Sequence, residues 1–266
     1  MPMISCPACG ASEYRVYGTR GRNRIVVCRG CTLFYVNPVP DREELDAGVK
    51  GSSAYTKDQE RKVDFFRARA ERLFDAVERH TAPGRVLDIG CAIGTELDVA
   101  RERGWEGVGL ELSLSSVQVA RERGLDVRQQ TLEESELPAG HFDLVTMNHV
   151  LEHIAYMDDF LSEVTRILVK KGLFYIAVPN VNAWRRFLRG KRYHWTFQDD
   201  HFFHFSPRTL KRLLEKHGFT ILELSTSRWV DFCDDLSSHS MLFRGINRVV
   251  EKLEKAIEII CLARVR

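Results

Sequence analysis

The sequence has no long apolar run and little net charge. No stretch approaches the roughly 18 consecutive apolar residues that a transmembrane helix needs, and the N-terminus lacks the basic start and apolar run of a signal peptide. The formal net charge of +2 is too small to indicate a nucleic-acid or membrane partner by itself. Internal repeats and low-complexity segments are also absent. We therefore expect a cytoplasmic protein without membrane contact, and 266 residues suffice for one mid-sized α/β domain plus a small appendage.

Four of the seven cysteines form two closely spaced pairs. Cys6 and Cys9 make one CxxC element, Cys28 and Cys31 make another, and 18 residues separate the two. Two such turns present four thiolates tetrahedrally, as zinc prefers, whereas a redox-active CxxC is normally a single pair that opens a helix. Four thiolates close the coordination shell, so the pattern predicts a structural Zn²⁺. The remaining cysteines are scattered, which predicts free thiols rather than a disulfide framework: Cys91, Cys233 and Cys261.

Residues 1–40 differ from the rest of the chain in composition and in the pattern of their apolar runs. This pattern predicts a zinc ribbon. They hold short β-rich runs at 14–17, 25–28 and 33–36, and the Asn37-Pro38-Val39-Pro40 segment then marks a linker. For residues 41–84 we expect that linker and one N-terminal helix over about 57–80. The ribbon hairpin carries five arginines against a single acid, Glu13. It is either a solvated hairpin or a patch for an acidic substrate, a carrier protein or RNA.

From residue 85 to 266 short apolar strands alternate with amphipathic helices. This alternation predicts βαβ units around a parallel sheet, an α/β fold. The predicted strands are 86–89, 107–110, 126–129, 142–147, 173–178, 219–224 and 257–265. The predicted helices lie near 94–103, 114–123, 150–169, 206–217 and 241–255. The last helix has an apolar face that packs on the core or makes a homodimer contact, and the oligomeric state stays open.

A glycine-containing turn follows the first of these strands. The segment from Asp88 to Gly94 reads DIGCAIG, a buried strand that leads into a turn and then a helix. Small residues there let the backbone approach a ligand at the carboxyl end of a strand. Glu111 ends the next strand, where a carboxylate can accept both ribose hydroxyls of an adenosine. A dinucleotide enzyme would need GxGxxG, but glycines occur only at positions 90 and 94 of this turn.

These motifs resemble, in order and spacing, those of the class I S-adenosylmethionine (SAM)-dependent methyltransferases of the ubiquinone-biosynthesis-like, type 23 group. The DIGCAIG turn is similar to the family's first motif, with Ala92 in place of its middle glycine. Segments 131–133 and 142–149 match those beside the adenine and the methionine portion. The resemblance implies a Rossmann-like, seven-stranded domain. It implies SAM-binding residues Asp88, Gly90, Cys91, Ala92, Gly94, Glu111, Leu112, Leu132, Glu133, Asn148 and His149.

Two later features also resemble this group: the His149–His153 segment, HVLEH, and the segment that runs from Ser206 to Phe219. Zinc ribbons with a linker similar to residues 37–40 precede such domains in sugar and polyketide tailoring enzymes. The resemblance therefore implies a small-molecule acceptor.

Several histidines lie where the acceptor should bind. A base is needed when the acceptor must lose a proton, and the predicted catalytic residues are His153 and His201. A second interpretation is a metal site formed by His149, Glu152 and His153 with His201 or His204. In some relatives an ExxEH motif binds a divalent metal, but His149 replaces the first Glu here. A third interpretation gives Glu152 and His153 a packing role only.

The segment 180–205 is longer than a simple strand-to-helix loop and is rich in aromatic and basic residues. Five basic residues crowd into positions 185–192. An aromatic wall with a basic rim suits a phosphate- or carboxylate-bearing acceptor, such as a nucleotide sugar or a carrier-linked intermediate. A packed helix with solvated arginines is the alternative. Together the sequence predicts O- or C-methylation of a small molecule, with an RNA methyltransferase or a non-catalytic SAM-binding scaffold as alternatives.

Overall fold

A computed structural model of the whole chain describes residues 2–21, 23–41, 53–183, 200–227 and 253–266. Contacts divide it into two compact units. Unit 1 comprises Met1–Pro40, Leu151–Met157 and Ile176–Cys261, and unit 2 comprises Asp41–Val150, Asp158–Tyr175 and Leu262–Arg266. The helix expected over 241–255, the basic cluster at 185–192 and Cys233 fall wholly or mostly outside the described residues. No described helix has the length and apolar character needed to cross a membrane.

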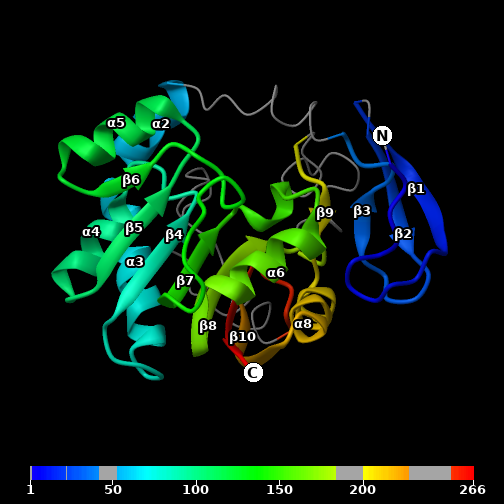
Figure 1. Cartoon of the computed structure of the whole chain (residues 1–266). Coiled ribbons are helices and arrows are strands. Elements are labelled where there is room, and N and C mark those ends of the chain that lie inside the picture. The colour runs from blue at the N-terminus through cyan, green and yellow to red at the C-terminus, as the bar shows by residue number, and fades with distance from the viewer. Residues whose placement is uncertain (1, 22, 42–52, 184–199, 228–252) are drawn as a thin grey trace, which may run out of the picture. The chain divides into compact units, whose positions relative to one another are not determined.

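The chain contains a seven-stranded sheet in the order β10-β11-β8-β7-β4-β5-β6. Strands β4, β5, β6 and β7 are paired in parallel in unit 2 (Figure 1). Their bounds are Arg85–Ile89, Glu106–Leu110, Asp126–Arg128 and Phe142–Asn148. The others are β8 Leu168–Pro179, β10 Phe219–Ser227 and β11 Glu258–Val265. The predicted Rossmann-like fold is confirmed, with β7 returning beside β4 after β5 and β6 have run outward. That reversal is the topological switch point where such sheets bind ligands.

Most helices of this sheet lie where the periodicity predicts them. They are α4 Thr95–Glu102, α5 Leu114–Glu122, α6 Met157–Ile167 and α8 Pro207–Lys216. The expected helix over 150–169 is wrong in its first part. Residues 154–156 are not helical, so the stretch before α6 holds only a short 3₁₀ turn at Leu151–His153, and α6 begins at Met157.

The single helix expected over 57–80 is also wrong. The structure has two helices, α2 Ser53–Arg61 and α3 Val63–Val77, which are separated at Lys62 (φ −111°, ψ 19°). The two helices have different packing partners. The Thr56 hydroxyl of α2 lies 2.7 and 2.9 Å from the hydroxyls of Ser115 and Ser116 on α5, while α3 packs against α4. Tertiary contacts therefore break a run that its periodicity alone would keep continuous.

A second, four-stranded sheet lies in unit 1, in the order β1-β2-β3-β9 (Figure 1). Strands β1 Tyr14–Arg20, β2 Asn23–Cys28 and β3 Phe34–Val36 form the antiparallel ribbon expected near the N-terminus. The fourth strand, β9 Phe203–His204, comes from the long segment after β8 and pairs antiparallel with β3. Sequence reasoning missed this pairing. The domain limits at residues 40 and 84 remain predictions.

Candidate functional site

The turn after β4 has the shape of a ligand-binding loop. Gly90 and Gly94 both have φ of +77°, and a Cβ on Gly90 would lie 2.4 Å from Val150 Cγ2. Ala92 also takes a left-handed φ, 48°, a conformation that costs an L-residue about 1–2 kcal/mol. The N–H groups of Gly90 and Cys91 donate to the Leu110 carbonyl at 2.8 and 3.1 Å. These bonds attach the turn to the end of β5.

Glu111, the predicted ribose acid, is held in place by the backbone around it. One carboxylate oxygen accepts from the Ala92 N–H at 2.9 Å, and the other accepts from Leu112 and Ser113 at 2.8 and 2.7 Å. Ser113 is also the N-cap of α5. The carboxylate is thus oriented by three N–H groups before any ligand arrives, and it lies directly beside the glycine turn.

Asn148, at the end of β7, lies between a cation and an acid. Its side-chain oxygen accepts from Arg69 of α3 at 2.8 Å, and its Nδ2 donates to Glu96 of α4 at 2.6 Å. These two contacts fix which way the carboxamide points. Burial raises the pKa of Glu96 to about 7, against the lowering effect of the hydrogen bond from Thr146 and the charge of Arg69.

Asp88 is buried at the end of β4, with 3% of its surface exposed. The Thr146 hydroxyl donates to it at 3.1 Å. Burial, reinforced by the negative charge of Glu96, raises the pKa of Asp88 well above its usual range. Its partner in the turn, Cys91, is packed in an apolar cluster with Leu97 and Val117, where burial raises the pKa of the thiol. We therefore assign Cys91 a packing role rather than a nucleophilic one.

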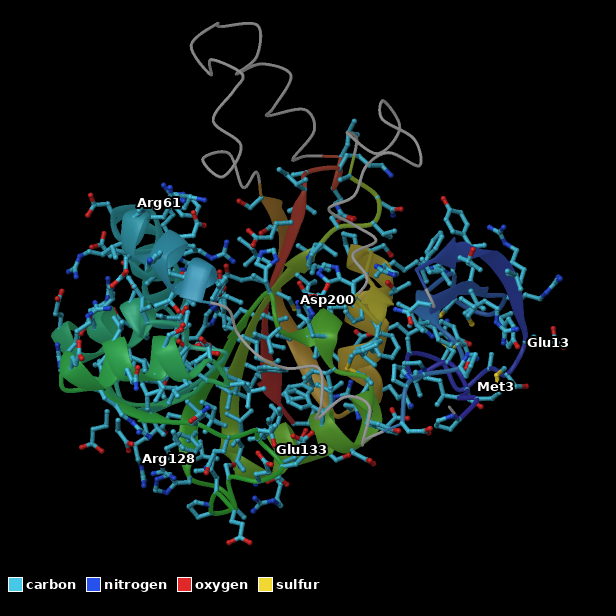
Figure 2. The ribbon with its side chains drawn as sticks, turned by 90° about the horizontal axis from the view of Figure 1, so that it is seen from above. Met3, Glu13, Arg61, Arg128, Glu133 and Asp200 are labelled. Carbon is cyan, nitrogen blue, oxygen red and sulfur yellow. The ribbon has the colours of Figure 1, made fainter. Side chains whose placement is uncertain are left out.

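The other predicted SAM-binding residues follow the same strand ends. Leu112 and His149 are half-buried. Leu132 is buried in the loop after β6, whereas Glu133, labelled in Figure 2, is exposed. The structure thus brings the turn, Glu111 and Asn148 to the carboxyl ends of β4, β5 and β7.

Unit 1 contains the two predicted catalytic histidines. The rings of His153 and His201 meet edge to face with centroids 4.7 Å apart, and His153 Nδ1 is 3.0 Å from the Asp200 carbonyl oxygen. Among the described residues, Glu152, His153 and His201 offer potential ligand atoms within 4.8 Å of one another. These three, called the histidine cluster below, belong to the set considered for a second metal. Glu152 and His201 are 1% and 5% exposed.

The four paired cysteines also converge in unit 1. Cys6 and Cys31 have sulfurs 3.5 Å apart, as do Cys9 and Cys28, and all four sulfurs lie within 4.8 Å of one another. Zinc–sulfur bonds of about 2.3 Å in a tetrahedron place the sulfurs about 3.8 Å apart, so the set fits zinc. The Gly30 N–H points at Cys28 Sγ at 3.3 Å. The hydrogen bond with Cys6 lowers the pKa of Cys31 to about 5.

Comparison with known proteins assigns the family. A sequence profile described as a methyltransferase domain matches residues 58–224. The chain belongs to this methyltransferase family. The ubiquinone biosynthesis O-methyltransferase of Bartonella tribocorum is 26% identical over 151 residues, 52% of this chain and 61% of that protein. The C-methyltransferase NovU of Streptomyces niveus is 25% identical over 214 residues, 76% of this chain and 48% of that protein.

This methyltransferase chain therefore spans less than two thirds of the length of these relatives. A SAM-dependent methyltransferase structure from Archaeoglobus fulgidus superposes with a TM-score of 0.60 at 21% identity. The match covers 80% of this chain and 100% of that one, and at this identity it shows a shared fold.

Sequence reasoning missed several residues of the methyltransferase site. Arg69 and Glu96 form hydrogen bonds with the Asn148 side chain. In the sequence they are recognisable only as members of amphipathic helices. Tyr55 on α2 is 47% exposed, and its pKa is raised by desolvation of the hydroxyl and by the charges of Glu111 and Asp88. No signal in the sequence marks Glu96, because acids are common in the first turn of a helix, where α4 also has Asp98.

Proposed function

We propose that this protein transfers a methyl group from SAM to a small-molecule acceptor, at an oxygen or a carbon atom. The observation that carries the proposal is the Glu111 carboxylate, which three backbone N–H groups fix beside a left-handed glycine turn. A carboxylate in this position accepts both hydroxyls of a ribose. When bound, SAM supplies an electrophilic methyl group on a sulfonium. The chain's own task is then to hold, align and deprotonate.

The remaining residues of unit 2 orient the ligand. The turn from Gly90 to Gly94 lets the backbone approach it closely, and Glu111 fixes its ribose. Asn148, held by Arg69 and Glu96, presents a carboxamide of defined orientation to the methionine portion. Leu132 and Glu133 flank the adenine in this proposal.

The histidine cluster supplies the base. A proton on His153 Nδ1 is donated to the Asp200 carbonyl at 3.0 Å, which leaves Nε2 as the proton acceptor. His201 lies against the His153 ring beside the Glu152 carboxylate. An imidazole is suited to taking a proton from a hydroxyl or an activated carbon near neutral pH.

The four cysteines hold a structural zinc ion, since protein thiolates fill all four positions. Two relatives support a small-molecule acceptor, because their names describe a ubiquinone biosynthesis O-methyltransferase and a C-methyltransferase. A structural neighbour with a TM-score of 0.52 is a geranyl diphosphate methyltransferase. A phosphate- or carboxylate-bearing acceptor also agrees with the basic residues of segment 185–192.

The test is transfer of a labelled methyl group from SAM into an extract of the source cells. The extract is separated into metabolite, protein and RNA fractions. We expect label in the metabolite fraction, at a rate that changes little with added salt. Label in RNA with a steep salt dependence would instead identify an RNA methyltransferase. Tight SAM binding without labelled product in any fraction would identify a scaffold.

A further inference from the structure

The zinc-bearing ribbon is attached to the histidine cluster by backbone hydrogen bonds within unit 1. The second CxxC knuckle leads directly into β3. The Cys28 N–H donates to the Leu33 carbonyl at 2.9 Å, and the Thr32 N–H donates to the Cys28 carbonyl at 3.1 Å. β3 begins at the next residue, Phe34. The position of β3 therefore follows from how this knuckle is held.

β3 in turn pairs with the segment that carries the histidines. Phe34 stands opposite His204, and Tyr35 stands opposite Phe203. The rings of Tyr35 and Phe203 stack with centroids 6.3 Å apart and planes 11° from parallel. Both side chains are almost fully buried. This contact is an edge-to-edge extension of the ribbon sheet with its own small apolar core.

One residue, Phe202, connects the ribbon to both halves of the cluster. Its carbonyl accepts from the Val36 N–H of β3 at 2.8 Å, and its own N–H donates to the Glu152 carbonyl at 2.8 Å. Phe202 directly follows His201 in the chain. The backbone of the ribbon, the backbone of His201–Phe202 and the 3₁₀ turn with Glu152 and His153 therefore form one continuous hydrogen-bonded unit.

Two further bonds attach the ribbon to the rest of unit 1. Lys216 at the end of α8 donates to the carbonyl of Pro7, which lies between the first two zinc-binding cysteines, at 2.8 Å. The Tyr156 hydroxyl, three residues after His153, donates to the Pro40 carbonyl at 3.2 Å. The ribbon is thus connected to the rest of unit 1 through its first CxxC turn, through β3 and through its last residue, Pro40.

We propose that the zinc-bound ribbon is a positioning device for the histidine cluster. This positioning role rests on the proposed methyl transfer, because the histidine cluster is the base of that reaction. A 40-residue module has too little core to fold alone, so metal binding supplies much of its folding energy. Without zinc, β3 loses its fixed geometry and β9 loses its partner. His201 and His204 then become exposed, while the SAM turn, built entirely within unit 2, keeps its structure.

The test uses diethyl pyrocarbonate, which modifies accessible imidazoles, with mass spectrometry to measure the labelling of each histidine. His201 and His204 are 5% and 2% exposed, whereas the half-buried His141 in unit 2 serves as the internal reference. We expect Cys9→Ser to remove the zinc and to raise the labelling rate of His201 and His204 about tenfold or more. His141 labelling and SAM affinity should change less than twofold.

Three controls make the result specific. Cys261→Ala removes a buried thiol outside the ribbon and should change neither zinc content nor labelling. Cys9→His keeps a tetrahedral Cys₃His site, so it should retain zinc and restore protection. For the wild-type protein, a chelator followed by added zinc should expose and then protect His201 again, which covers the case where Cys9→Ser does not fold.

Zinc loss with unchanged labelling of His201 would overturn the proposal. Equal loss of SAM affinity and protection in the chelated protein would also overturn it, because the ribbon would then support the whole fold rather than the cluster. Failure of the proposed function is distinguishable, since the wild-type protein would then transfer no labelled methyl group to a metabolite, whatever the histidine labelling shows.

Discussion

Replacing Glu111 with alanine removes the carboxylate that links the glycine turn to the start of α5. In the wild-type protein this group accepts three backbone hydrogen bonds, from Ala92, Leu112 and Ser113. With SAM bound it would also accept two bonds from the ribose hydroxyls. The substitution therefore affects both the bound ligand and the local backbone, and the two effects have to be measured separately.

The effect on binding follows from the two ribose bonds. Hydrogen bonds to a charged group contribute about 1.5–3 kcal/mol each, and water partly replaces them at the half-buried Glu111. We therefore expect SAM binding to weaken by about 2–4 kcal/mol, a factor on the order of 30 to 1,000 in Kd. Ala92 and Ser113 are almost fully buried, so water replaces the carboxylate only in part at these N–H groups, and we expect a stability loss of about 1–3 kcal/mol.

Isothermal titration calorimetry with SAM and thermal unfolding without it separate the two effects. The matched control is Glu122→Ala, which removes an exposed carboxylate from α5 and should leave both measurements unchanged. A Glu111→Ala protein that binds SAM within twofold of wild type would refute the assignment of the ribose site. A protein that unfolds at room temperature would show that the carboxylate is mainly structural.

Further predictions concern the turn, the buried acid and the bases. Gly90→Ala should destabilise the protein by about 1–3 kcal/mol and abolish tight SAM binding, because its φ is +77° and its Cβ would meet Val150. The pKa of Glu96 is raised to about 7, so the folded state binds a proton more tightly than the unfolded state. Wild-type stability should therefore fall by about 1–3 kcal/mol as pH rises from about 4.5 to 7, and Glu96→Gln should remove this component. His153→Ala and His201→Ala should each lower turnover by about 10²- to 10⁴-fold with little change in SAM affinity.

Each of these three predictions has a control that tests it. Gly140→Ala also places alanine at a positive φ, but nothing lies within 4 Å of its Cβ, so it should lose stability and keep SAM binding. The same pH dependence in wild type and Glu96→Gln would show that another group, such as Asp88, dominates. Full turnover in both histidine variants would exclude the cluster as the base, and His141→Ala serves as the control for loss of an imidazole outside it.

The sequence predicts those parts of the molecule that depend on neighbours in the chain. The strand–turn–helix pattern around Gly90 and the acid after β5 are local, and both occupy the expected positions in the structure. The two CxxC turns are local as well, and their convergence follows from the antiparallel pairing of β1 with β2, which brings the start of β1 beside the end of β2. The histidine cluster is partly predictable, because His153 and His201 follow β7 and β8, which are neighbours in the seven-stranded sheet.

Features that depend on distant partners could not be predicted in this way. The break at Lys62 has no glycine or proline to mark it and arises because α2 and α3 pack on different helices. The two hydrogen bonds that hold the Asn148 side chain are formed with Arg69 and Glu96, which only the folded protein brings together. Strand β9 has two residues, too few for an alternation pattern, and it exists because β3 offers an unpaired edge.

The pairing of β3 with β9 also has a consequence for the order of events during synthesis. Phe34 and His204 are far apart in the chain, so their contact has a high contact order. At translation rates of about 5–20 residues per second, β3 waits roughly ten to thirty seconds for its partner. During that time the nascent ribbon presents a bare sheet edge that can pair with other chains. Early binding of zinc would fold the ribbon and so limit this pairing with other chains. We therefore expect zinc-starved cells to accumulate aggregates of newly made protein, while chains that have already folded stay in solution.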